Sequence, residues 1–198
     1  MNINLIYPEL PTPVAHLFPD SQVTEQKVLR ILSSQIEFQF HQSAKDIPSA
    51  TIRTITASIE TLLKKLPALE RKLPASSNLN VILTLGASVQ DGQWHSASGW
   101  EVRYQSTSPE SERLADLYIR QALRILGRSA ISNQTAVISQ RIVSTARLLD
   151  VTASPTILTT NLHIDNKANA SLLRSVSGIR SLARIHAEAL KQYLELSQ

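Results

Sequence analysis

The stretch Asn80–Leu85, which reads Asn-Val-Ile-Leu-Thr-Leu, decides the fold. Its apolar run is almost unbroken, and such a run is typical of a β-strand that is covered on both faces. Two shorter runs, Asn4–Tyr7 and Thr156–Thr159, have the same character. The three runs predict neighbouring central strands of one mainly parallel sheet. Trp100–Tyr104 alternates between polar and apolar residues and predicts a further strand.

Segments whose apolar residues recur at helical spacing lie between these strands in the sequence. The second helix would place Ile52, Ile55 and Ile59 on one side, and the third would have Ser108 as its cap and Pro109 at its first position. The predicted helices cover about 21–40, 52–63, 109–126 and 170–194. Strands that alternate with helices in this way indicate an α/β fold. We therefore expect residues 1–198 to form a single three-layer domain, a twisted sheet with helices on both faces.

The amino-acid composition excludes several kinds of functional site. The chain has 198 residues and no cysteine, which excludes disulfides, thiolate zinc sites and a cysteine nucleophile. The formal charge is +4, but the arginines of the second half are interleaved with acidic residues such as Glu112, Asp116 and Glu188. This pattern indicates solvated helix faces, so a nucleic-acid partner is not expected.

The beginning of the chain, Met1–Pro8, has neither a basic head nor a long apolar stretch. It does not have the pattern of a signal peptide, and no window approaches the ~20 apolar residues of a membrane helix. We expect a soluble protein made in the cytoplasm, with no membrane partner. Such a protein suits a virion or a secretion machine.

Several short motifs resemble the zinc-dependent N-acetylmuramoyl-L-alanine amidases, which cleave the bond between muramic acid and L-alanine in peptidoglycan. The best match is Leu148–Thr160, which is similar to the family's segment where a proline precedes an apolar strand ending in Val-Glu. Gly99–Tyr104 resembles the family's Gly-Val-Glu-Val-Tyr strand, and Ile164–Asn166 with the helix after it resembles the family's Leu-Ser-Asn and terminal helix. The resemblance implies an amidase-like α/β fold over nearly the whole chain.

The residues that the resemblance assigns to catalysis are mostly replaced. Leu10 and Gly86 stand where the family has histidine ligands of zinc, and Thr160 stands where it has the catalytic glutamate. Only Glu25 is retained, and on its own it is expected to act as a first-turn acid that complements the helix dipole. Zinc amidase chemistry needs three ligands and a carboxylate that shuttles the proton. We therefore expect no catalytic residue, no metal and no cofactor.

The chain is accordingly predicted to be a degenerate amidase homologue that binds peptidoglycan or a protein partner. Candidate binding residues are Trp94, His95 and Trp100, which lie in or beside a polar loop where an aromatic ring could stack on a sugar. His163 and His186 are expected to be packed. The alternative is an active peptidoglycan amidase whose zinc site is rebuilt from residues in or near the loops after the strands, namely His16, Glu25, His95 and His163. Homo-oligomeric scaffolding is a third reading.

Overall fold

The computed structural model describes residues 1–9, 18–20, 23–47, 50–71, 77–87, 93–105, 107–127 and 147–197. They form a five-stranded sheet in the order β2-β1-β3-β5-β4. The strands are β1 (Asn2–Glu9), β2 (Thr51–Ser58), β3 (Asn78–Gly86), β4 (Trp100–Tyr104) and β5 (Thr156–His163). The helices are α1 (Glu25–Ser43), α2 (Ile59–Glu70), α3 (Pro109–Leu126), α4 (Arg147–Asp150), α5 (Lys167–Arg174) and α6 (Val176–Leu196).

The three predicted central strands are neighbours, as expected. β3 pairs in parallel with β1 on one side and with β5 on the other, so that Val81 lies opposite Leu5 and Ile157. β2 continues the sheet in parallel beyond β1, whereas β4 closes the other edge antiparallel to β5. The mainly parallel sheet is confirmed.

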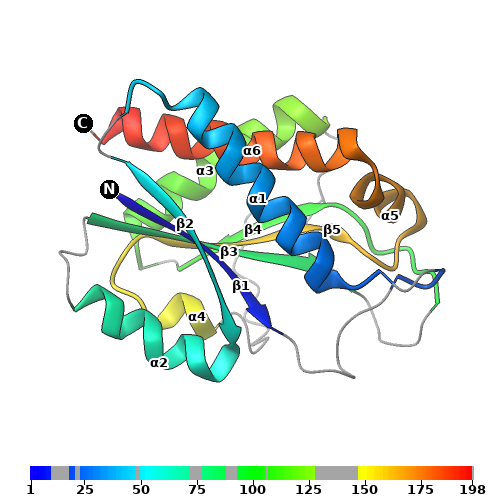
Figure 1. The fold of residues 1–198 in the computed structure, drawn as a ribbon, viewed down its shortest axis with the longest axis horizontal. Coiled ribbons are helices and arrows are strands. Elements are labelled where there is room, and N and C mark those ends of the chain that lie inside the picture. Colours follow the sequence, from blue (N-terminus) through cyan, green and yellow to red (C-terminus); the bar gives the residue numbers. More distant parts are fainter. Residues whose placement is uncertain are drawn as a thin grey trace.

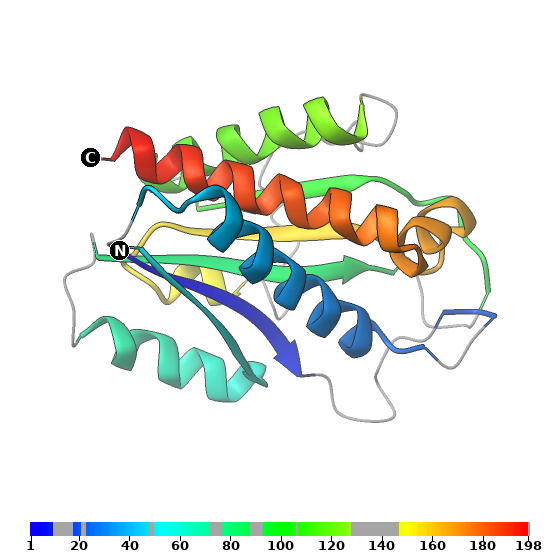
Figure 2. The ribbon, with the colours of Figure 1, turned by 45° about the horizontal axis from the view of Figure 1, so that its top comes forward.

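Helices cover both faces of the sheet, which confirms the three layers (Figures 1 and 2). α1, α3 and α6 lie on one face, over a large core that includes Leu5, Val81 and Ile157. α2 and α4 lie on the other face, over a smaller cluster that includes Ile82 and Leu158. Successive strand residues point to opposite faces, so each central strand supplies apolar side chains to both layers.

The helix predicted over 52–63 is wrong in its first half. Thr51–Ser58 is the edge strand β2, and the helix begins only at Ile59. The spacing of Ile52 and Ile55 fits a helix, but it also fits a strand whose two faces are half-buried. Ile52 packs against the large cluster and Ile55 against the small one. The β-branched residues of this segment favour the strand.

Two helix boundaries also differ from the predictions. The first helix begins at Glu25 with Thr24 as its cap, rather than near Ser21. The helix predicted over 170–194 is divided into α5 and α6 at Ser175, which is the C-cap of one helix and the N-cap of the other. The Ser175 hydroxyl accepts a hydrogen bond from Gly178 N at 2.9 Å, and such capping residues favour a new helix start.

Replacing Ile157 with alanine should lower the free energy of unfolding by about 2–5 kcal/mol, because the side chain is fully buried in the large core cluster. Val176→Ala is the matched control, since Val176 is 69% exposed and its loss should change stability by less than about 0.5 kcal/mol. Urea denaturation followed by circular dichroism measures both. Equal effects of the two substitutions would contradict the core described here.

Candidate functional site

The candidate site lies at the carboxyl edge of the sheet, where β1, β3 and β5 end. In open parallel sheets, ligands bind beyond this edge. The last residues of these strands are Glu9, Gly86 and His163. The first turn of α1 also reaches this edge and brings Glu25 to the end of β3. We call this group of strand ends and the first turn of α1 the carboxyl-edge site.

Glu25 is a buried carboxylate rather than a surface acid at a helix terminus. Its side chain is only 6% exposed, and its Oε1 accepts a hydrogen bond from Leu85 N at 3.2 Å. Burial raises the pKa of Glu25 to about 7, against the opposing effect of the hydrogen bond from Leu85. The expectation that Glu25 only complements the helix dipole is therefore incomplete. Its first-turn position is confirmed, but its environment is the end of β3.

The imidazole of His163 lies directly on Gly86. A Cβ atom at position 86 would meet the Nδ1 and Cε1 atoms of His163 at 2.6 Å, so a side chain fits at this position only if the ring moves. A glycine in a strand often marks such a close approach. The His163 ring therefore fills the space into which a residue-86 side chain would point.

A bulge near the end of β5 gives His163 this position. The pairing of β3 with β5 shifts from Thr84 opposite Thr160 to Gly86 opposite His163, so β5 holds one extra residue. Leu162 within the bulge has a φ of 72°, a left-handed conformation that costs energy for a residue with a branched side chain. The chain after it is held by a hydrogen bond from Ile164 N to Gly86 O at 2.9 Å.

His163 is mostly buried beside an acid. Its Nδ1 lies 3.9 Å from Oδ1 of Asp165. Burial lowers the pKa of His163, although Asp165 and Glu101 act in the opposite direction. A neutral imidazole at neutral pH follows from these effects. The expectation that His163 is packed agrees with this environment, but the sequence did not reveal that it packs on Gly86.

The described residues do not fit a zinc site of the amidase type. They contain no group of three His, Cys, Asp or Glu side chains placed to hold a metal ion. Gly86 has no donor, and Thr160 is a largely buried residue within β5 whose neutral hydroxyl is a weak ligand. Leu10 and His16 lie outside the described residues. Among the described residues at the positions that the resemblance assigns, Glu25 is the one that supplies a carboxylate.

Trp100 is a core residue, so its side chain is not accessible to a ligand as the prediction of a binding residue requires. It is 1% exposed and stacks on Tyr118 with ring centroids 6.4 Å apart. Its Nε1 donates a hydrogen bond to Asn161 Oδ1 at 3.1 Å. His186 is packed, as predicted: it is fully buried, its Nε2 lies 2.8 Å from the same Asn161 oxygen, and burial lowers its pKa to about 3.

Trp94 and His95 lie beside the carboxyl-edge site. Trp94 is half-buried and packs against the large core cluster. The backbone N of His95 donates to Asp165 O at 2.6 Å, and Asn166 Nδ2 donates to His95 O at 3.3 Å. The segment 93–99 is thus fixed against the turn that follows β5, so these two candidate binding residues lie near His163.

No described helix combines the length and apolar character needed to cross a membrane.

No protein-family model matches the sequence, and a search of curated proteins finds no similar one. Solved structures of N-acetylmuramoyl-L-alanine amidases, however, have the same fold. The catalytic domain of CwlV from Bacillus (Paenibacillus) polymyxa var. colistinus superposes with a TM-score of 0.72 at 13% identity, over 98% of this chain and 99% of that one. The CwlD amidase of Clostridioides difficile, in complex with the GerS lipoprotein, superposes with a TM-score of 0.71 at 13% identity, over 98% of each chain.

AmiC2 of Nostoc punctiforme, another such amidase, gives a TM-score of 0.68 at 14% identity over 98% of this chain and 97% of that one. At these identities the comparison establishes the fold, which agrees with the amidase-like architecture that the sequence motifs implied. The chain spans almost the full length of these three structures.

The raised pKa of Glu25 predicts that stability falls as the pH rises from about 4.5 to about 7. The unfolded chain loses the Glu25 proton first, so rising pH favours unfolding over this range. The pKa of Glu25 rises from 4.5 in the unfolded chain to about 7 in the folded one. At about 1.4 kcal/mol per pKa unit, this rise lowers the free energy of unfolding at high pH by about 3 kcal/mol. Glu25→Gln stays neutral and should be about 3 kcal/mol more stable than the wild type at pH 8.

Urea denaturation between pH 4 and pH 8 measures this difference. Glu60→Gln, a substitution at an exposed residue of α2, is the control and should follow the wild-type curve. Parallel curves for the wild type and Glu25→Gln would show that Glu25 is not buried as described.

Proposed function

We propose that this chain is a degenerate homologue of the N-acetylmuramoyl-L-alanine amidases, which does not hydrolyse peptidoglycan and acts as a binding or assembly module. The observation that carries the proposal is the contact between His163 and Gly86. The imidazole occupies the space in which the amidase resemblance places the side chain of a zinc ligand, and the residue beneath it has no donor atom. The carboxyl-edge site is thus packed rather than open at this position.

The chemistry of the retained residues supports the same proposal. A zinc amidase needs three ligands to hold the metal and lower the pKa of its bound water. It also needs a carboxylate within reach of the scissile bond. Glu25 can supply only one of these groups, and its carboxylate is already engaged by Leu85 N. Thr160 cannot accept and return a proton near neutral pH as a glutamate does.

Two classes of ligand suit the binding module. Its fold is that of enzymes that act on peptidoglycan, so a cell-wall glycan is one candidate. The structural neighbour CwlD is in complex with the lipoprotein GerS, so a domain of this fold can also bind a protein. The half-buried Trp94 beside the carboxyl-edge site offers part of an aromatic face to either ligand.

The second candidate function is an active zinc-dependent amidase with non-standard ligands. The specific observation in its favour is again His163, because the ring restores an imidazole to the space above Gly86. The carboxylate of Glu25 is close to this space, because it accepts a hydrogen bond from the backbone N of Leu85, the residue before Gly86. This candidate needs a third ligand, which the described residues do not place at the site.

Hydrolysis separates the two candidates. We expect the purified protein, supplied with zinc, to release no free L-alanine amino groups from peptidoglycan, because the described site holds too few metal ligands. The CwlV catalytic domain is the positive control. Release by the wild type that is lost in both Glu25→Gln and His163→Ala would contradict the binding proposal and establish the second candidate.

The binding surface is tested with purified peptidoglycan sacculi in a co-sedimentation assay. Trp94→Ala should weaken binding by about thirtyfold, which corresponds to the roughly 2 kcal/mol of an aromatic anchor. Glu25→Gln should leave binding unchanged, because its carboxylate is buried. Circular dichroism confirms that both variants are folded at the assay temperature.

Loss of binding with Glu25→Gln alone would show that the ancestral cleft still binds the ligand. A wild-type protein that stays wholly in the supernatant would exclude the glycan and leave the protein partner.

A further inference from the structure

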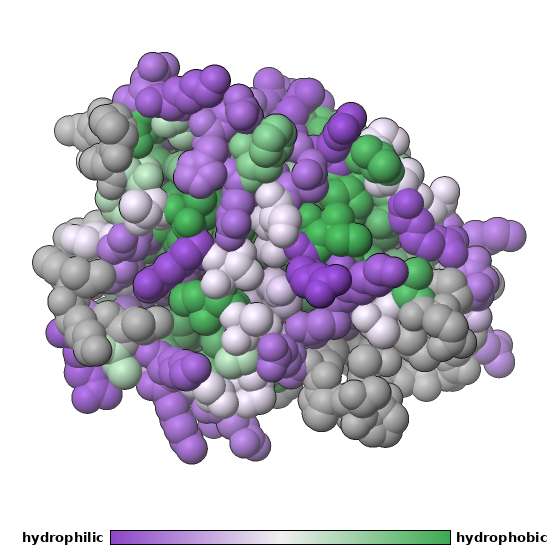
Figure 3. All heavy atoms as spheres, viewed as in Figure 1, coloured by the Kyte–Doolittle hydropathy of each residue, from purple (hydrophilic) through white to green (hydrophobic). Residues whose placement is uncertain are grey.

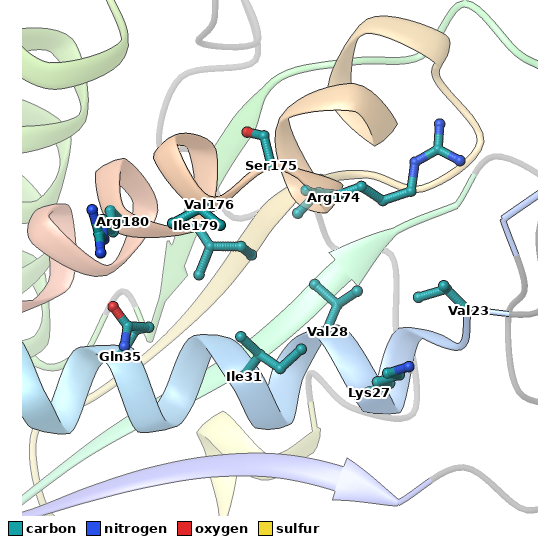
Figure 4. A pocket seen from close by; sticks show the side chains of 11 residues that line it. Val23, Lys27, Val28, Ile31, Gln35, Arg174, Ser175, Val176, Ile179 and Arg180 are labelled. Atoms are coloured by element: carbon teal, nitrogen blue, oxygen red, sulfur yellow. The ribbon is translucent and has the colours of Figure 1, made fainter.

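A groove of about 490 Å³ lies between α1 and the junction of α5 with α6 (Figure 4). Its apolar walls come from both sides: Val28 and Ile31 from α1, Leu173 from α5, and Val176 and Ile179 from α6. We call it the α1–α6 groove. Glu25, Gly86 and His163 do not line it, although Lys27 and Val28 belong to the same first turn of α1 as Glu25.

The apolar walls of the groove are exposed to an unusual extent. Ile31 is 44% exposed and Val176 is 69% exposed, although both are aliphatic residues on helices whose outer faces are otherwise largely polar. Figure 3 shows apolar side chains gathered between α1 and the beginning of α6, with hydrophilic side chains around them. Apolar surface that is gathered in a hollow and rimmed by polar residues marks a binding site.

The shape of the groove is fixed by the break between α5 and α6. Ser175 N donates to Leu172 O at 3.1 Å, and the Ser175 hydroxyl accepts from Gly178 N at 2.9 Å, so one residue caps both helices. At position 178 a Cβ would lie 2.1 Å from Leu172 O, so the break requires glycine there. The wall formed by Val176 and Ile179 is therefore preformed, which lowers the entropic cost of binding.

The rim of the groove is positively charged. Lys27, Arg174 and Arg180 line it, and none of the described lining residues is acidic. Arg174 is partly neutralised by Asp20, whose Oδ1 lies 2.6 Å from its Nη1. Lys27 and Arg180 form no ion pair with another described residue. The groove therefore favours a ligand that presents carboxylates beside an apolar face.

The geometry favours a helix as this ligand. The segment of α1 from Lys27 to Gln35 is about 12 Å long, at about 1.5 Å per residue. Two helices thus bound an apolar groove that extends over about two turns of α1, an arrangement that a third amphipathic helix fills with residues at i, i+3, i+4 and i+7. A flat bilayer cannot fill a concave surface. A second copy of this chain carries the same charge of +4, which disfavours its approach to the basic rim.

We propose that the α1–α6 groove binds an amphipathic helix of a protein partner, whose apolar face fills the groove and whose flanks carry carboxylates opposite Lys27 and Arg180. The proposal does not depend on whether the carboxyl-edge site is catalytic, because Glu25, Gly86 and His163 do not line the groove.

Two synthetic helical peptides test the proposal by fluorescence anisotropy with the full-length protein. Both have the same leucine face at helical spacing over about fourteen residues, and their flanking positions are glutamate in one and lysine in the other. The glutamate peptide should bind at least about tenfold more tightly, and salt should weaken its binding. Ile31→Asn should reduce that affinity at least about tenfold. Arg180→Glu should reduce the preference for the glutamate peptide.

Matched controls lie on α1 outside the groove. Phe38→Asn removes an apolar side chain that is 58% exposed, and Arg30→Glu reverses an exposed charge. Both variants should bind the glutamate peptide as the wild type does. Because all the substituted residues are exposed, circular dichroism should show every variant folded.

Several results would overturn the proposal. Binding of neither peptide, equal binding of both, or the same loss with Phe38→Asn as with Ile31→Asn would exclude an acidic helix in this groove. Light scattering that shows a dimer abolished by Ile31→Asn would assign the groove to a second copy of the chain. Binding to phosphatidylglycerol vesicles that is lost in Ile31→Asn, with no peptide binding, would assign it to a lipid surface.

Discussion

The pairing of β3 with both β1 and β5 is the constraint on which the rest of the structure depends. Val81 and Ile82 point to opposite faces and are fully buried, so helices must cover the sheet on both sides. Parallel pairing also brings the ends of three strands to one edge. The carboxyl-edge site, the start of α1 and the 93–99 segment all meet at that edge, which is why short and separated motifs in the sequence converge in space.

Patterns within short stretches of sequence predicted the strands and the helix start that depend on neighbouring residues alone. The three apolar runs became neighbouring strands, and Ser108 with Pro109 begins α3 as expected. The spacing of Ile52 and Ile55 was misleading, because a half-buried edge strand can place two apolar residues on opposite faces and still match a helical spacing. The break at Ser175 was missed because it depends on the close approach of Gly178 to Leu172 O, a contact across a turn that no periodicity reveals.

In the candidate site, too, the sequence did not reveal contacts between residues that are distant in the chain. The sequence identified Glu25 and Gly86, but it could not give the burial that raises the pKa of Glu25 to about 7. Nor could it show that His163 lies on Gly86, because that contact needs a bulge in β5 and a positive φ at Leu162, which is not a residue that favours such a conformation. Trp100 was misjudged for a related reason: its partners, Asn161 and Tyr118, are distant in sequence.

The central proposal is that the fold of the N-acetylmuramoyl-L-alanine amidases is kept in this chain while a zinc site is not. X-ray diffraction from crystals grown with equimolar zinc, with data collected on both sides of the zinc absorption edge, tests it most directly. The account predicts no anomalous peak among Glu25, Gly86 and Thr160. A peak at about 2.0–2.2 Å from both a Glu25 oxygen and a His163 nitrogen would contradict it, because those are the distances of zinc ligands.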